Sequence, residues 1–167
     1  MIKPNDISKF ADAVRLRKEL KLSPGQVDSL IFHANSLQGY KKLNPKISPK
    51  DYERKVLPTI LDDSQYTSLL LLHYKDKAVA WAKDDWKELN ERGIATGLDS
   101  VTATRQIINY NLAKWAISDR LGKAGSHSSP SIKSIETPMP EAMQRLRTAR
   151  RYNNPIPDKA SKAAFAW

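Results

Sequence analysis

Four arginines within residues 145–151 form the densest group of side chains suited to binding chemistry. A guanidinium group binds phosphate through a planar fork of N–H donors, so a cluster of such groups is suited to an anionic partner. The cluster therefore predicts phosphate contacts by Arg145, Arg147, Arg150 and Arg151. An acidic protein partner, or simple solvation of a basic helix, is the alternative for these side chains.

Residues suited to catalysis form no comparable group. The three histidines, His33, His73 and His127, are widely spaced and belong to no catalytic or zinc-binding motif. The chain has no cysteine, which excludes disulfides, thiolate metal sites and thiol catalysis. No glycine-rich phosphate loop follows a strand pattern. We therefore expect a protein that is not an enzyme and has no cofactor.

One acidic group has some metal-binding character. Its four carboxylates fall within residues 84–91 and belong to Asp84, Asp85, Glu88 and Glu91. Lys83 and Lys87 are interleaved with them, and the group lies largely away from the main apolar stripe of the expected helix. This pattern is typical of a solvated helix face, so we expect no metal site.

The distribution of charge points to an anionic partner. Net charge is +10, and residues 1–59 carry 12 Lys/Arg against 6 Asp/Glu. Residues 60–122 carry 8 against 9, and residues 123–167 carry 8 against 3. A neutral middle with basic ends is typical of a scaffold whose arms contact the phosphates of DNA or RNA, although ordinary solubility charge is the alternative. The expected N-terminal contacts are Lys9, Arg15, Arg17, Lys18, Lys41, Lys42 and Lys46.

No stretch shows a convincing strand pattern, whereas several show helical spacing of apolar residues. We predict an all-α protein, a four- or five-helix bundle with a basic N-terminal helical arm and an extended basic C-terminal tail. The longest helix spans residues 62–93, where Asp62, Asp63 or Ser64 can cap the start and Gly93 can end it. Further helices are expected at about residues 5–20, 23–39, 48–57, 100–121 and 141–152.

Turn-forming residues mark the other boundaries. The Ser-Pro-Gly-Gln sequence at 23–26 is a strong helix start, and Ser48 opens a similar sequence. Pro58 should end the third helix, residues 40–50 form a basic loop, and residues 123–140 form a Gly/Ser/Pro linker. The expected organisation is an N-terminal arm or hairpin, a helical core, and a linker with an Arg-rich helix and tail, at residues 1–47, 48–122 and 123–167.

The longest predicted helix has two apolar faces. The broader face holds Leu71, Leu72, Ala78, Val79, Ala82, Trp86 and Leu89. The narrower face holds Leu70, Tyr74 and Trp81. A helix with two apolar faces has two partners, so we expect the narrower face to contact another subunit. Phe165 and Trp167, in an uncharged end of the tail, are expected to dock on a neighbouring subunit, and stacking on bases is the alternative.

A DNA-reading alternative lies at residues 93–106. A helix ends at Gly93, a short turn follows, and the next helix opens with side chains that can reach bases or phosphates. These side chains are Ser100, Thr102, Thr104, Arg105 and Gln106. The pattern loosely resembles a helix-turn-helix and predicts a DNA-binding regulator or an accessory factor of a mobile element.

No apolar run is long enough to span a bilayer, and the N-terminus lacks the apolar segment of a secretory signal. We therefore expect a cytoplasmic or virion protein. The basic ends, the two-sided helix and the apolar tail favour a non-enzymatic structural protein that binds DNA or RNA through the phosphate backbone and packs with other copies of itself. The expected function is a coat or nucleocapsid-type subunit or a ribonucleoprotein subunit, and a protein–protein adaptor is a third alternative.

Overall fold

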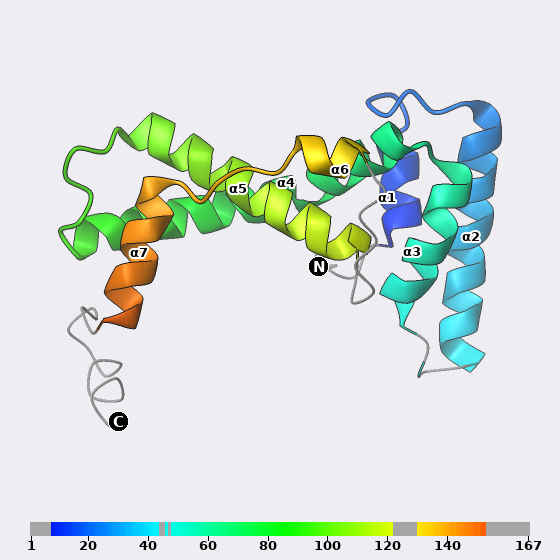
Figure 1. Cartoon of the computed structure of the whole chain (residues 1–167). Coiled ribbons are helices and arrows are strands. Elements are labelled where there is room, and N and C mark those ends of the chain that lie inside the picture. The colour runs from blue at the N-terminus through cyan, green and yellow to red at the C-terminus, as the bar shows by residue number, and fades with distance from the viewer. Residues whose placement is uncertain (1–7, 44–45, 47, 122–129, 153–167) are drawn as a thin grey trace. The chain divides into compact units, whose positions relative to one another are not determined.

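The computed structural model describes residues 8–43, 46, 48–121 and 130–152 (Figure 1). Every regular element in these residues is a helix, so the predicted all-α class is confirmed. The arrangement as a four- or five-helix bundle with basic arms stays a prediction. The helices are α1 (Lys9–Arg15), α2 (Pro24–Leu43), α3 (Pro49–Ile60), α4 (Asp63–Glu91), α5 (Ser100–Leu121), α6 (Pro130–Ser134) and α7 (Glu141–Arg151).

The chain divides into two compact units. Unit 1 comprises Met1–Tyr74 and Trp115–Ile135, and unit 2 comprises Lys75–Lys114 and Glu136–Trp167. Both boundaries in the middle of the chain fall within helices, so α4 and α5 each contribute to both units. Neither unit coincides with one of the three consecutive parts expected from the sequence.

The predicted helix starts at Ser23, Ser48 and Asp62 are confirmed by their capping hydrogen bonds. At α2 the Gln26 N–H donates to the Ser23 hydroxyl oxygen (3.2 Å), and the Ser23 N–H donates to Gln26 Oε1 (2.9 Å). Asp62 and Gln65 form the same reciprocal pair at the start of α4, with distances of 2.7 and 3.1 Å. Ser48 accepts one backbone hydrogen bond before α3. These bonds join residues three apart, which is why a local sequence pattern predicts them.

α1 is shorter than the helix predicted at residues 5–20. The Ser8 side chain accepts a backbone hydrogen bond and caps the start, and the helix ends at Arg15. The chain then turns, with Lys21 in the left-handed region (φ 55°). Leu20 still lies in the core, so the predicted apolar position is correct although the residue is not helical. Residues 5–7 lie outside the described part.

Two helices are longer than predicted. α2 passes Gly39 and ends at Leu43, so the first part of the expected loop is helical. α3 passes Pro58 and ends at Ile60. Pro58 has no N–H to donate to the carbonyl of Arg54, but the Leu61 N–H donates to the Leu57 carbonyl (2.9 Å), so the helix continues for two residues past the proline. The short α6 replaces part of the linker expected at 123–140.

In unit 1, the leucines of α4 that face the core are not the ones predicted. Leu69 and Leu70 are fully buried, whereas Leu71 and Leu72 are half-buried. The expected subunit contact of Leu70 is therefore wrong, because this side chain packs inside its own unit. The buried apolar residues of the core are Phe10, Ala13, Leu16, Leu20, Leu30, Leu37, Leu57, Leu61, Tyr66, Leu69, Leu70 and Ala116.

A buried cluster of charged groups joins α1, α3 and α5 inside unit 1. Lys9 Nζ lies 3.2 Å from Glu53 Oε2 and 3.1 Å from Asp119 Oδ2, and all three residues are buried. The Tyr74 hydroxyl donates to Asp119, and burial together with this bond raises the pKa of Tyr74. The expected phosphate contact of Lys9 is wrong, because the ammonium group is enclosed and already paired.

Asp12 of α1 forms a second ionic group in unit 1. Its carboxylate lies 2.9 Å from His73 Nδ1 and accepts a hydrogen bond from the Arg15 guanidinium (2.6 Å). Burial alone would raise the pKa of Asp12, but the hydrogen bonds from His73 and Arg15 outweigh it and hold the pKa below 3.8. These contacts tie α1 to α4.

Unit 2 has its own small core, formed by α4, α5 and α7. The predicted end of the long helix is confirmed, because α4 stops at Glu91 and Gly93 adopts a φ of 70°. Gly97, with a φ of 80°, completes the turn to α5. The buried core residues are Ala82, Leu89, Ala103, Ile107, Ala142 and Leu146.

Replacing Lys9 with alanine should lower the free energy of unfolding by about 3–5 kcal/mol, because Glu53 and Asp119 would stay buried without their cation. Urea unfolding followed by circular dichroism measures the change. Lys18→Ala removes the same charge from an exposed side chain and should cost less than about 0.5 kcal/mol. Equal stability of the two variants would contradict the buried cluster.

Asp12→Asn should destabilise the fold by about 1.5–3 kcal/mol at pH 5, where its charged hydrogen bonds are intact. The folded-state pKa of Asp12 lies below its ordinary value of 3.8. The carboxylate therefore stabilises the fold above that value, and the contribution is lost as the pH falls through the lowered pKa. Urea unfolding at several acidic pH values should show the difference from wild type narrowing toward low pH. A difference that widens would contradict the assignment.

Candidate nucleic-acid interface

α7 carries the arginine cluster and is fixed in unit 2 by its apolar edge. Ala142, Leu146 and Ala149 are buried, with the spacing of three and four residues that puts them on one face of a helix. The helix predicted at residues 141–152 is confirmed to within one residue. The arginines occupy the rest of the helix circumference, so their surroundings decide which of them are free to bind a partner.

Arg145 is engaged within unit 2. Its guanidinium donates to the carbonyl oxygens of Ile94 (3.0 Å) and Thr96 (2.7 Å) and to the carboxylate of Glu141 (2.8 Å). The first two bonds fasten α7 to the turn between α4 and α5. Arg145 therefore has a structural role, because these three hydrogen bonds hold its guanidinium against unit 2.

Arg150 faces the acidic group of α4. Its Nε and NH2 donate to the two carboxylate oxygens of Glu88 (3.0 and 2.9 Å), and NH2 also donates to Asp85 (3.2 Å). The hydrogen bond from Arg150 lowers the pKa of Glu88, whereas burial raises the pKa of Asp85. The expected solvated face is thus only partly present, because Asp85 and Glu88 are half-buried against α7. One arginine of the α7 cluster is therefore explained by its ion pairs with carboxylates of α4.

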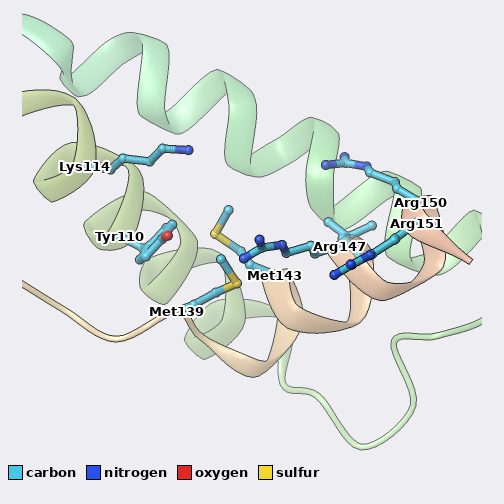
Figure 2. Close-up of a pocket in the computed structure, with 8 residues that line it drawn as sticks. Tyr110, Lys114, Met139, Met143, Arg147, Arg150 and Arg151 are labelled. Atoms are coloured by element: carbon cyan, nitrogen blue, oxygen red, sulfur yellow. The ribbon is translucent and has the colours of Figure 1, made fainter. Parts of the chain in front are cut away.

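A groove of about 700 Å³ in unit 2 is lined by α5, by α7 and by Met139 of the segment before α7, and we call it the α5–α7 groove. Figure 2 shows Arg147 and Arg151 extending along it from α7, while Arg150 points toward α4. Tyr110 and Lys114 come from α5, four residues apart and so on the same side of that helix. The complete lining is Tyr110, Lys114, Met139, Met143, Leu146, Arg147, Arg150 and Arg151.

Three cations of the α5–α7 groove form no ion pair with any residue that the structure describes. Lys114, Arg147 and Arg151 are exposed, and within the described residues none of them has a carboxylate at ion-pair distance. The Arg151 guanidinium lies 5.7 Å from the ring centroid of the exposed Tyr152. A concave surface with several unneutralised cations concentrates anions, so the groove is suited to phosphate.

The sequence pattern misses most of this groove. It predicts phosphate contacts by Arg147, Arg150 and Arg151 but does not predict Tyr110, Lys114 or the two methionines as site residues. The available signal was the Tyr110/Lys114 pair one helical turn apart, since an aromatic and a cation on one helix face can form a binding wall. Their partnership with α7 depends on tertiary packing, which residue spacing does not reveal.

The other predicted phosphate contacts belong to unit 1. Arg15 is bonded to Asp12, although most of its side chain is exposed. Lys41 and Lys42 lie on α2, and their side chains are outside the described part. The exposed candidates that remain are Arg17, Lys18 and Lys46.

Among the predicted subunit contacts, Trp81 is exposed. Its side chain is 51% exposed, with Lys77 Nζ 5.4 Å from the ring centroid. Tyr74 is half-buried and bonded to Asp119, so its hydroxyl serves unit 1 itself. Phe165 and Trp167 lie outside the described residues. The Trp81 side chain is therefore exposed enough to contact another subunit.

The start of α5 displays the polar side chains of the helix-turn-helix alternative. Ser100, Arg105 and Gln106 are exposed. The Asp99 carboxylate caps the helix by accepting the Thr102 N–H (2.8 Å), and this hydrogen bond lowers the pKa of Asp99. A carboxylate at this position opposes phosphate binding at the helix N-terminus, because it occupies the positive end of the helix dipole.

The described residues offer few other chemistries. They contain no group of three His, Asp or Glu side chains placed to hold a metal ion. His33 Nδ1 lies 2.8 Å from the Tyr52 hydroxyl, and His73 is paired with Asp12, so both side chains have partners within unit 1. In the same part of the chain, no helix has the length and apolar character to cross a membrane.

Comparison with known proteins assigns no family to this chain. No family model, no curated protein and no solved structure matches it. The geometry and charge of the α5–α7 groove are therefore the basis for a functional proposal.

Arg150→Ala should lower the free energy of unfolding by about 1 kcal/mol, because Glu88 loses a bidentate partner and Asp85 loses a hydrogen bond. The value is small because the Arg150 side chain is half-exposed. Arg147→Ala removes the same charge from the same helix and should cost less than about 0.5 kcal/mol. Urea unfolding of both variants measures the contrast. Equal losses would contradict the division into a structural Arg150 and a groove Arg147.

Proposed function

We propose that this chain is a non-enzymatic structural protein that binds DNA or RNA through the phosphate backbone. The observation that carries the proposal is that Lys114, Arg147 and Arg151 line the α5–α7 groove and have no ion-pair partner among the described residues. Guanidinium groups engage phosphate oxygens through paired N–H donors, and an ammonium group adds a point charge. The basic groove and the strongly basic chain ends support the same partner.

The arrangement of α7 favours a contact that does not depend on base sequence. Arg147 and Arg151 are one helical turn apart, so both can reach a backbone that passes along the groove. Neighbouring Arg145 and Arg150 are held by unit 2 itself and fix the helix that carries them. Phosphate contacts position a protein on nucleic acid without reading its sequence.

The second part of the proposal is packing in a large or repetitive assembly, as a coat or nucleocapsid-type subunit or a ribonucleoprotein subunit. Exposed large apolar side chains support it, because such residues favour burial against a partner. In unit 1 the clearest is Phe32, 65% exposed; in unit 2 Trp81 and Val101 are 51% and 73% exposed. The uncharged C-terminal segment with Phe165 and Trp167 is the proposed docking element.

The helix-turn-helix regulator remains the second candidate, favoured by the exposed Arg105 and Gln106 near the start of α5. The Asp99 cap weighs against it, since its negative charge faces the position that a phosphate would take. Replacing Arg105 and Gln106 with alanine distinguishes the two candidate functions. The double variant of a regulator should lose preference for particular DNA sequences, whereas that of a backbone-binding protein should bind nucleic acid nearly as the wild type does.

Replacing Arg147 and Arg151 together with alanine should weaken duplex binding and make the slope of log affinity against log salt shallower by about 2, since two phosphate contacts are lost. Fluorescence anisotropy over a salt series measures this slope. Lys50→Ala/Lys55→Ala removes the same net charge from exposed positions on α3 and should leave the slope nearly unchanged. An equal effect of both double variants would contradict a local contact at the groove.

Size-exclusion chromatography with absorbance at 260 and 280 nm tests the assembly. A coat-type subunit should co-elute with nucleic acid in high-mass material. Elution as a monomer or dimer without nucleic acid at low salt would contradict this part of the proposal. If the affinity for duplex did not change with salt concentration, the result would instead favour the protein–protein adaptor.

A further inference from the structure

The α5–α7 groove is not uniformly cationic, and its apolar part needs an explanation. Tyr110, Met139 and Met143 line it together with the arginines and Lys114. Figure 2 shows Tyr110 and Lys114 together on α5 at one side of the groove, the two methionines next to them, and Arg147 and Arg151 extending from α7 toward the methionines. A surface that only contacts the phosphates of a duplex requires no such wall, because a duplex presents phosphate and sugar there.

From this division we infer that the α5–α7 groove binds an unpaired nucleotide of a single-stranded nucleic acid, with the base against Tyr110 and the neighbouring phosphates of the strand on Arg147, Arg151 and Lys114. The inference rests on the proposed function and specifies its ligand. Aromatic rings in a basic groove are the usual platform for unpaired bases, since every base has a flat face that can stack. A duplex keeps its bases stacked inside and would have to expel one to use the site.

The position of Tyr110 is consistent with a binding wall. The residue is half-buried and does not belong to the buried core cluster of unit 2. Its hydroxyl has no hydrogen-bond partner among the described residues. Beneath the groove, Leu146 is 1% exposed, so the floor is part of the packed core. The apolar end is therefore built on a fixed floor.

The spacing along both helices produces the two-part character. On α5, Lys114 follows Tyr110 by one turn, and on α7, Met143, Arg147 and Arg151 follow one another by one turn. Each helix thus contributes an apolar residue and then cations on one side. The groove volume of about 700 Å³ lies within the roughly 300–1,000 Å³ typical of sites for small organic groups.

Fluorescence anisotropy of the full chain with a labelled oligothymidylate, and with a duplex of equal length, tests the inference. Wild-type protein should prefer the single strand. Tyr110→Leu keeps an apolar side chain but removes the ring, and it should weaken single-strand binding about 5- to 100-fold, as expected for loss of one stacked base, with little change for duplex. Tyr110→Phe keeps the ring and should retain binding. An unchanged thermal unfolding curve for Tyr110→Leu confirms that the fold is intact.

The possible results separate this inference from the proposed function. If single strand and duplex bind equally and Tyr110→Leu changes neither, the base-stacking site is wrong while phosphate-backbone binding stands. If neither ligand binds at low salt, both proposals fail. Competition by thymidine monophosphate distinguishes the source of the nucleotide: displacement of the oligonucleotide at equal concentration would point to a free-nucleotide site and overturn the inference.

If Tyr110→Leu unfolds the protein, Tyr110→Phe and Lys114→Gln provide the decisive comparison. Lys114→Gln should weaken both ligands, whereas Tyr110→Phe should weaken neither. A Tyr110→Phe variant with intact fold that loses single-strand binding would show that the hydroxyl, not the ring, makes the contact, and would overturn base stacking.

Discussion

The ion pairs of Lys9 with Glu53 and Asp119 are the constraint on which unit 1 depends. Charged groups are costly to remove from water unless each meets a partner. α1, α3 and α5 must therefore approach in one arrangement, in which a single ammonium group serves two carboxylates. The Tyr74 hydroxyl completes the cluster from α4. The need to pair buried charges explains why Lys9, although it lies in the basic N-terminal part of the sequence, cannot reach a ligand.

Unit 2 uses its charges differently. Arg145 donates hydrogen bonds to backbone carbonyls of the turn after α4, and Arg150 donates to carboxylates of α4. These bonds position α7 against α4 and that turn. Arg147 and Arg151, on the same short helix, stay open to a partner. A single dense run of arginines thus contains two structural residues and two residues of the candidate site. Charge density alone does not distinguish them, because the difference lies in what each guanidinium faces.

The features that the sequence predicts well are local. The caps at Ser23 and Asp62 and the stop at Gly93 depend on residues within one turn, and all three are observed. The partners of Lys9 and Arg150 are not predictable in this way, since Glu53 lies 44 residues from Lys9, Asp119 lies farther still along the chain, and Glu88 lies 62 residues from Arg150. Burial of Leu70 likewise depends on tertiary packing. The same holds for the α5–α7 groove, whose arginines appear in the sequence but whose aromatic wall requires two helices to meet.

Our central proposal is that nucleic acid binds in the α5–α7 groove. NMR titration of the isotope-labelled full chain with a single-stranded oligonucleotide tests this most directly, because it reports each backbone amide separately. The proposal predicts the largest chemical-shift changes at residues 110–114 and 143–151, with smaller changes elsewhere in unit 2. Changes confined to the basic surface of unit 1, or no changes at low salt, would contradict it.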